Sequence, residues 1–186
     1  LPPASSLSIP RQDLREAVER RRSLRRYAGT PLDREELSFM LWCTQGIRRL
    51  VPGSATFRNV PSAGARHAIE TYLLVNDVRE VPEGLYRYSA LRHALVELKR
   101  GPALAERLTA ACLGQEFVKA SAVSFVWTAA LHRMRWRYGE RGYRYLLLDA
   151  GHVCQNLYLA AEAVGCGACA IAAFDDQDVD RLLGLD

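Results

Sequence analysis

The sequence predicts an α+β sandwich, in which helices cover a sheet. Two observations favour this class: four segments of strand composition follow one another in the middle of the chain, and one long helical pattern spans residues 141–164. Strands and helices do not alternate strictly, as they do around a parallel sheet. With 186 residues, of which 49% are hydrophobic and 25% charged, the chain is long enough to bury one core, and no repeat or linker divides it. We therefore expect one domain over residues 1–186.

Two helical patterns occupy the N-terminal quarter of the chain. Residues 11–22 are predicted to form the first helix. Asp33 and Glu36 have the spacing of a capping box, in which the side chains of the first and fourth residues satisfy each other's backbone N–H groups. The second helix is therefore expected to begin here and to run through Trp42 towards Gly46.

Four strands are predicted next, because segments rich in Val, Leu, Tyr and Phe alternate with turn residues. These segments are Ile69 to Val75, Gly84 to Tyr88, Ala94 to Leu98 and Val123 to Thr128. Tyr86 and Tyr88 are interpreted as strand packing. Residues 48–67, which precede the strands, are predicted to be loop, and a short helix is expected within residues 103–119.

The long helix is indicated by apolar residues that recur every three or four positions, the period of one helix face. These residues are Leu146, Ala150, Val153, Leu157, Ala160 and Val164. The pattern predicts one largely buried helix over residues 141–164, ended by Gly165 because glycine readily takes the left-handed conformation of a helix C-terminus. His152 within it is interpreted as a core residue. Ala170 to Phe174 then predict a buried strand, and residues 178–183 a final short helix.

The charge pattern bears on possible partners. The formal net charge is +4, and the only lysines are Lys99 and Lys119, so arginine supplies almost all of the positive charge. The arginine side chain suits forked contacts with phosphate or carboxylate. Most arginines are scattered among acids, and no nucleic-acid-binding motif accompanies them. We therefore expect no nucleic-acid partner and interpret most arginines as solvated helix faces.

Nothing in the sequence predicts a membrane protein. No apolar run reaches the length of a membrane-spanning helix, and the first residues lack the basic start and apolar middle of a signal peptide. The expected location is cytoplasmic.

The five cysteines suggest no disulfide and no metal site. Cys43, Cys112 and Cys154 stand alone among apolar residues and are interpreted as small hydrophobes. Cys166 and Cys169 have the spacing of a redox dithiol or half a zinc site, but no second pair of ligands is suitably spaced. A structural role is favoured for this pair. Residues 165–170 also fit G-x-G-x-x-A, but a helix precedes them, whereas a dinucleotide fingerprint follows a strand.

Two motifs point to a cofactor. The basic segment 20–27 can direct guanidinium groups and a hydroxyl at one phosphate-sized anion, and residues 58–65 offer a hydroxyl and open backbone on which a flat ligand could lie. Together they suggest a flavin mononucleotide (FMN) site. The simpler alternatives are an exposed helix end for the first motif and an ordinary loop for the second.

The residues carry a resemblance over almost the whole chain. Five motifs stand in the same order as in the nitroreductase superfamily, and in particular in its SagB-type dehydrogenases of peptide-antibiotic biosynthesis. They are Arg21-Arg22-Ser23-x-Arg25-x-Tyr27, residues 41–46 (Leu-Trp-Cys-Thr-Gln-Gly), residues 61–67 (Pro-Ser-Ala-Gly-Ala-Arg-His), residues 84–88 (Gly-Leu-Tyr-Arg-Tyr) and residues 148–152 (Leu-Asp-Ala-Gly-His). The resemblance implies an α/β/α sandwich with a central mixed, largely antiparallel sheet and a long buried helix.

The resemblance also implies a homodimer with FMN at the subunit interface. Its phosphate and ribityl chain would be held by Arg21, Arg22, Ser23 and Arg25. The loop Pro61, Ser62, Ala63 and Gly64 would approach the flavin from the partner chain. Ala172 and Ala173 stand where the family's backbone amides face the flavin N5 edge. No metal is implied.

Hydride transfer through flavin N5 is the chemistry that the resemblance implies. It takes two forms: reduction of nitroaromatic or quinone-type acceptors by NADH or NADPH, or SagB-type dehydrogenation of a small-molecule or peptide substrate. Azoline-oxidising relatives use a Lys-Tyr pair to remove a substrate proton, and Arg137-Tyr138 stands in its place here. Arginine stays protonated and cannot be the base, so Tyr138 is the candidate proton donor or substrate contact, with core packing as the alternative.

Two further points stay open in the sequence. Family members usually continue into a C-terminal strand that crosses to the partner, and the resemblance implies that this strand is missing from the present sequence. The electron donor has no fingerprint of its own, because nicotinamide stacks on the flavin in this family.

A non-catalytic flavin-binding or scaffolding dimer subunit is kept as the alternative function.

Overall fold

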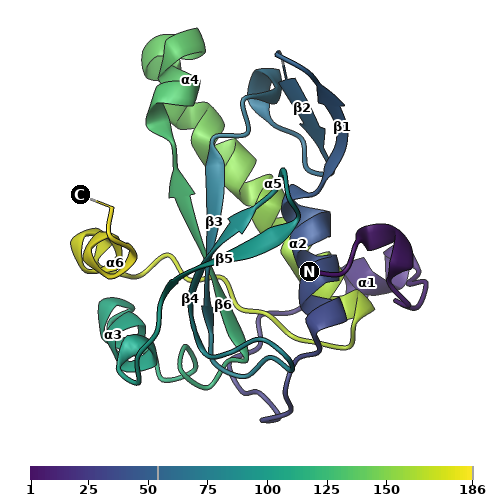
Figure 1. The fold of residues 1–186 in the computed structure, drawn as a ribbon, viewed down its shortest axis with the longest axis vertical. Coiled ribbons are helices and arrows are strands. Elements are labelled where there is room, and N and C mark those ends of the chain that lie inside the picture. The colour runs from purple at the N-terminus through teal and green to yellow at the C-terminus, as the bar shows by residue number, and fades with distance from the viewer. Residues whose placement is uncertain (54, 186) are drawn as a thin grey trace.

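A four-stranded antiparallel sheet forms the centre of the protein (Figure 1). The computed structural model describes residues 1–53 and 55–185. The strand order is β5-β4-β3-β6, and every neighbouring pair is antiparallel. The strands are β3 (Ile69–Val75), β4 (Gly84–Ser89), β5 (Ala94–Lys99) and β6 (Val123–Ala129). All four predicted strands are confirmed, with ends that differ from the prediction by no more than one residue.

Helices cover both faces of the sheet, as the predicted α+β sandwich requires. Alternate side chains of β3 point to opposite faces: Leu73 and Val75 pack in one core, and Tyr72 and Leu74 in another. The first core includes residues of α2 (Arg34–Gln45) and α5 (Gly142–Ala163), and the second includes residues of α3 (Leu104–Ala111) and α6 (Asp176–Leu183). Figure 1 shows α2 and α5 on one side of the sheet and α3 and α6 on the other. The structure therefore confirms the sandwich.

The predicted helix starts follow local chemistry. Asp33 caps α2 in a complete capping box, and its backbone N–H donates to Glu36 Oε2 at 2.8 Å. Helix α1 (Leu14–Arg20) is shorter than the predicted 11–22, because Asp13 accepts a hydrogen bond from Glu16 N and so marks its start. The short helix α3 lies within the expected range, and the final helix α6 ends at Leu183 as expected but begins two residues earlier than predicted, at Asp176.

Helix α5 buries the face that its apolar period predicts. Leu146 and Val153 belong to the buried core, and Gly165, with φ of 69°, follows its C-terminus. The opposite face is uncovered: the side chain of Leu147 is 77% exposed and that of Leu148 is 54% exposed. His152 lies on this exposed face, so its interpretation as a core residue is wrong.

The prediction of loop over residues 48–67 is wrong in its first half. Strands β1 (Ile47–Val51) and β2 (Ala55–Arg58) pair antiparallel as a separate two-stranded sheet. Their side chains are mostly exposed or half-buried, so they lack the apolar alternation that marks a strand packed on a core. Helix α4 (Leu131–Tyr138), which precedes α5, was also not expected as a separate element.

The predicted buried strand over Ala170 to Phe174 is also wrong. This segment lies outside the named strands, and Ala170, Ala172, Ala173 and Phe174 are exposed. Its composition suits a strand, but the sheet ends at β6 on one edge and at β5 on the other.

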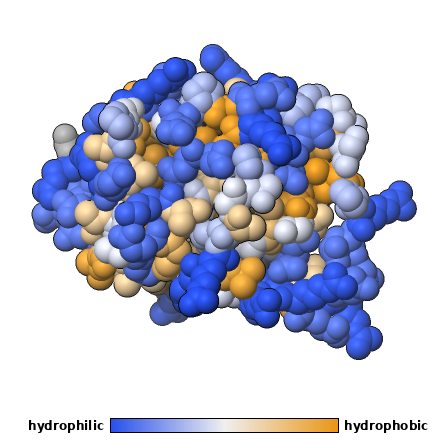
Figure 2. All heavy atoms as spheres, turned by 90° about the horizontal axis from the view of Figure 1, so that it is seen from below, coloured by the Kyte–Doolittle hydropathy of each residue, from blue (hydrophilic) through white to orange (hydrophobic). Residues whose placement is uncertain are grey.

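The surface is mostly polar on the face opposite the β1–β2 hairpin. Figure 2 shows this face with hydrophilic residues over most of its area and hydrophobic residues in separate smaller patches. Among the described residues, no helix is both long and apolar enough to cross a membrane.

Candidate cofactor site

The arginine-rich segment lies against the end of α5 and the strand-like segment that follows it. Ser23 Oγ and Tyr158 Oη are 2.9 Å apart, and Ala170 N donates to Tyr158 Oη at 2.8 Å. Leu24 N donates to Ala168 O at 3.0 Å. Tyr158 is nearly buried and therefore fixes both segments at one point. Tyr158 was not among the predicted site residues, and its only signal in the sequence is a polar hydroxyl within an apolar helix.

Close packing explains Gly167, the glycine between Cys166 and Ala168. A Cβ atom added to Gly167 would lie 2.3 Å from Leu24 Cδ1. The glycine therefore allows the backbone at Gly167 to pack closely against Leu24. This packing role agrees with the rejection of the G-x-G-x-x-A pattern as a dinucleotide fingerprint.

Arg21, Arg22 and Arg25 of the basic segment have no acidic partner within the described part of the chain, whereas Arg20 forms an ion pair with Glu16 at 3.5 Å. Arg21 lies over the Tyr158 ring, 5.5 Å from its centroid, and Arg25 lies 6.0 Å from the centroid of Phe117. None of Arg21, Arg22 and Arg25 forms an ion pair with a described carboxylate. Their guanidinium groups are therefore free to bind an anion, which fits the chemistry of a phosphate.

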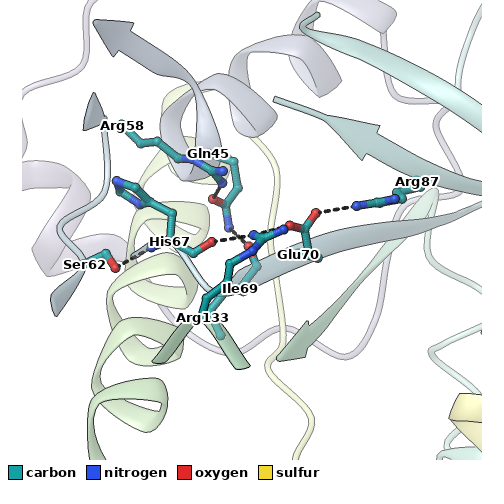
Figure 3. Close-up of polar contacts among 8 residues, drawn as sticks. All are labelled: Gln45, Arg58, Ser62, His67, Ile69, Glu70, Arg87 and Arg133. Carbon is teal, nitrogen blue, oxygen red and sulfur yellow. Dashed lines mark hydrogen bonds and ion pairs between the residues drawn. The ribbon is translucent and has the colours of Figure 1, made fainter. Parts of the chain in front are cut away.

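The loop of residues 61–64 is held by a buried carboxylate of α5. Asp149 accepts hydrogen bonds from Ser62 Oγ at 2.6 Å and from Ala63 N at 3.1 Å, and only 3% of its surface is exposed. Ser62 Oγ also accepts from His67 N at 2.9 Å (Figure 3). The Ser62 hydroxyl, which the sequence offered as a ligand contact, is thus used within the chain.

Tyr138 lies beside the same loop. Gly64 has φ of 56°, and a Cβ atom there would lie 2.5 Å from Tyr138 Oη and 3.2 Å from Arg137 Nε. The Tyr138 ring also packs on Tyr145, with centroids 4.6 Å apart. The Tyr138 ring is therefore packed and its hydroxyl lies at the loop, while its role as proton donor or substrate contact stays a prediction.

The two motifs are attached to opposite flanks of one helix. Asp149 and Tyr158 are nine residues apart on α5, which places them about 13.5 Å apart along the axis and about half a turn around it. The structure therefore does not bring Arg21 to Arg25 together with the 61–64 loop of the same chain. Ala172 and Ala173 lie on the Tyr158 side, in the extended segment after Ala170, where Ala173 O accepts from Gln115 Nε2 at 3.1 Å.

The cysteines show no sign of a reactive pair. All five are free thiols. Burial raises the pKa of Cys43 and of Cys166 to about 11, and it also raises the pKa of Cys112 and Cys154. Since the thiolate is the nucleophile, burial disfavours the reactive form of these four thiols. Among the residues described, no group of three or more His, Cys, Asp or Glu side chains is arranged to hold a metal ion.

The fold and the two motifs define an α+β sandwich protein with a basic segment and a Pro-Ser-Ala-Gly loop on opposite flanks of its long helix. The chain belongs to the nitroreductase family, whose members are flavin-dependent oxidoreductases: the model of that family matches residues 18–186.

Individual proteins agree with this assignment. A Methanocaldococcus jannaschii protein named as a nitroreductase is 36% identical over 172 residues, covering 92% of this chain and 84% of that protein. A crystal structure from Anabaena variabilis, also named as a nitroreductase, is 32% identical with a TM-score of 0.78, covering 94% of this chain but only 35% of the other. The trifolitoxin-processing protein TfxB of Rhizobium leguminosarum is 30% identical over 147 residues, which is 77% of this chain and 39% of TfxB.

Proposed function

We propose that the protein is an FMN-dependent oxidoreductase that works as a homodimer, with each flavin held between two chains. The observation that carries this proposal is the exposed face of α5. Leu147 and Leu148 leave apolar surface uncovered on the helix that anchors both motifs, and Leu14 and Val18 of the neighbouring α1 are 68% and 51% exposed. Exposed apolar surface of this kind marks an interaction site. A second copy would cover it and bring its own 61–64 loop to the basic segment.

The residues of the basic segment would hold the phosphate and ribityl chain. Arg21, Arg22 and Arg25 supply unpaired guanidinium groups, and Ser23 is fixed beside them by Tyr158. Ala172 and Ala173 are small and exposed, so their backbone can approach the flavin edge closely. The bound flavin would supply hydride chemistry at N5. No described residue needs to form a covalent bond.

The 61–64 loop would present backbone and small side chains to the flavin of the partner chain. The Ser62 hydroxyl donates a hydrogen bond to Asp149, so Ser62 would act by shaping the loop. Pro61, Ala63 and Gly64 would supply the surface of the loop. Tyr138, whose hydroxyl lies beside Gly64, would contact the substrate or donate a proton to it. Arg137 would bind a substrate carboxylate or carbonyl.

Two reactions fit this site. One is reduction of a nitroaromatic or quinone-type acceptor by NADH or NADPH. The other is SagB-type dehydrogenation of a peptide substrate, and the similarity to a toxin-processing protein favours it. A flavin-binding or scaffolding subunit without turnover is the second candidate function, because arginine replaces the lysine base at position 137.

The test is the visible spectrum of the purified protein, taken anaerobically before and after addition of NADH and NADPH. We expect flavin bands in the parent, their loss in the double variant Arg21→Ala, Ser23→Ala, and their retention in Arg48→Gln, which removes one exposed charge elsewhere. Bleaching by either nucleotide would identify the electron donor. Persistent colour would favour a substrate-reduced dehydrogenase or the subunit without turnover. A parent that takes up no added FMN would overturn the proposal.

A further inference from the structure

A concave site lies at the end of the sheet where β3 begins and β4 ends. It is an open hollow of about 1030 Å³, between the β1–β2 hairpin, the sheet and α4. This volume is at the upper end of the range of small-molecule sites. Figure 3 shows the polar side chains gathered here from α2, β2, β3, β4 and α4. None of the arginines of the basic segment lines it.

The charges of the hollow are unbalanced. Among the described residues that line it, four arginines face one carboxylate, that of Glu70. Arg133 donates to Glu70 Oε1 at 2.5 Å and Arg87 donates to Glu70 Oε2 at 3.1 Å. Burial alone would raise the pKa of Glu70, but these two hydrogen bonds outweigh it and lower the pKa below its usual value. Glu70 is therefore fully engaged by two of the four arginines.

Arg58 is the first arginine left without a counter-ion. Its Nη1 donates to the neutral side chain of Gln45 at 2.6 Å, and Gln45 Nε2 donates to Ile69 O at 3.3 Å, so the guanidinium is fixed in direction. Its Nε is buried and has no acceptor among the described residues. Burial also lowers the pKa of Arg58. A desolvated guanidinium without a carboxylate is costly, and an anion bound in the hollow would offset that cost.

Arg66 is the second arginine of the hollow without a carboxylate partner. The same hollow also has an apolar wall. Arg66 Nε donates to Gly64 O at 3.0 Å, and its guanidinium lies 5.5 Å from the ring centroid of Trp136. Leu50, Val96 and Leu98, which also line the hollow, are 55%, 46% and 44% exposed. Positive charge and exposed aliphatic surface within one hollow suit a ligand with an anionic head and an apolar body.

We propose that this hollow is a binding site for a carboxylate carried on an apolar body. The carboxylate would lie between Arg58 and Arg66, and the apolar body would cover Leu50, Val96 and Leu98. A bare inorganic anion would leave that wall uncovered. None of the residues assigned to the proposed flavin site lines the hollow, although Arg66 adjoins that site through its hydrogen bond to Gly64 O. Binding of the carboxylate does not depend on flavin being bound. The carboxylate could come from a free organic acid or from the C-terminus of a peptide, because both present the same head group.

Isothermal titration calorimetry with matched acids and amides tests the proposal, with FMN present throughout. The free-acid probe is 4-phenylbutyrate against 4-phenylbutyramide, and the peptide probe is N-acetyl-Leu-Phe with a free or an amidated C-terminus. We expect at least one acid to bind about tenfold or more tightly than its amide, since a charged hydrogen bond to arginine is lost in the amide. Which acid binds better identifies the source of the carboxylate.

Variants then locate the binding. Arg66→Gln, which changes a half-buried side chain, should weaken acid binding about tenfold, and Arg58→Gln should do so if it folds. Arg48→Gln, on the same hairpin but outside the hollow, and Ser23→Ala, in the proposed flavin site, should leave it unchanged. Acids that bind no better than amides would overturn the proposal. So would equal losses in Arg66→Gln and Arg48→Gln, which would indicate a net-charge effect, or a loss in Ser23→Ala alone, which would place the acid at the flavin.

Discussion

Asp149 and Ser62, 87 positions apart in the chain, are joined by a 2.6 Å hydrogen bond that ties the 61–64 loop to α5. The same carboxylate accepts from Ala63 N, so one buried side chain fixes two successive residues of the loop. A buried acceptor with two donors is expensive to remove, because both donors lose a charged partner.

Replacing Asp149 should therefore affect stability and cofactor binding together. We expect Asp149→Ala to lower the free energy of unfolding by about 3 kcal/mol, and Asp149→Asn to cost less because its carbonyl can still accept from Ala63 N. Urea titration gives the stability, and fluorescence titration with FMN gives the affinity. Exposed Asp77→Ala is the control. An Asp149→Asn variant with full stability and unchanged FMN affinity would show that the loop needs no such anchor.

Tyr158 should matter through its hydroxyl. Tyr158→Phe removes the oxygen that joins Ser23 to Ala170 N, so we expect a loss of about 1 kcal/mol in stability and weaker FMN binding. Tyr86→Phe is a matched control, because it removes a hydroxyl that donates to Pro82 O at 2.7 Å and not to any residue of the basic segment. Its FMN affinity should equal that of the parent. Equal FMN affinities in the two variants would contradict the role given to Tyr158.

Gly64 should tolerate no side chain while Tyr138 is present. Gly64→Ala places a methyl group 2.5 Å from Tyr138 Oη and forces alanine to a φ of 56°, so we expect a loss of about 1–3 kcal/mol. Adding Tyr138→Phe removes the nearest atom and should restore part of the loss, but not the backbone strain. Thermal unfolding of the two single variants and the double variant measures this coupling. Strictly additive effects would mean that the two residues do not meet in solution.

His67 should make the fold sensitive to acid. Burial, and then the charge of Arg58, lower the pKa of His67 to about 4, against about 6.5 in an unfolded chain. The neutral ring is favoured in the folded state, so this contribution to stability is complete above pH 6.5 and is lost as the pH falls towards 4. It amounts to at most about 3 kcal/mol. The lowered pKa of Glu70 acts in the same direction, at lower pH.

The measurement for His67 is urea unfolding at pH 7 and at pH 5. The parent should lose stability between these values, and His67→Asn should lose less. Asparagine is chosen because His67 has φ of 44°, a conformation that asparagine tolerates. A parent and variant with the same pH dependence would rule out His67 as its source.

The sheet was predictable because both of its faces are covered. Ile69 to Val75 coincide with β3 since their composition reflects burial on two sides. The β1–β2 hairpin was not predictable from the same signal: Arg48, Arg49 and Leu50 are all exposed, and the pair packs mainly on itself. The opposite error occurred at Ala170 to Phe174, where a strand was predicted and none forms. Strand composition does not indicate whether a sheet edge is close enough for the segment to pair with.

The sequence motifs of the candidate site could be predicted, but the partners that their side chains contact could not. The sequence pointed to Ser23 and Ser62 as ligand hydroxyls, whereas the structure pairs Ser23 with Tyr158 and Ser62 with Asp149. A single aspartate inside an apolar helix was the available signal for the second contact, because buried carboxylates need donors. Nothing in the spacing of Arg58, Glu70, Arg87 and Arg133 indicated that the fold gathers them around one hollow.

The attachment of the two motifs to opposite flanks of α5 has a thermodynamic consequence for the proposed dimer. If each flavin takes its phosphate contacts from one chain and its loop from the other, pairing of chains and uptake of cofactor are linked equilibria. By reciprocity, FMN must tighten subunit association by the same factor by which association tightens FMN binding. Diluting the protein would then release flavin, so the yellow colour of a preparation would depend on its concentration as well as on its purity.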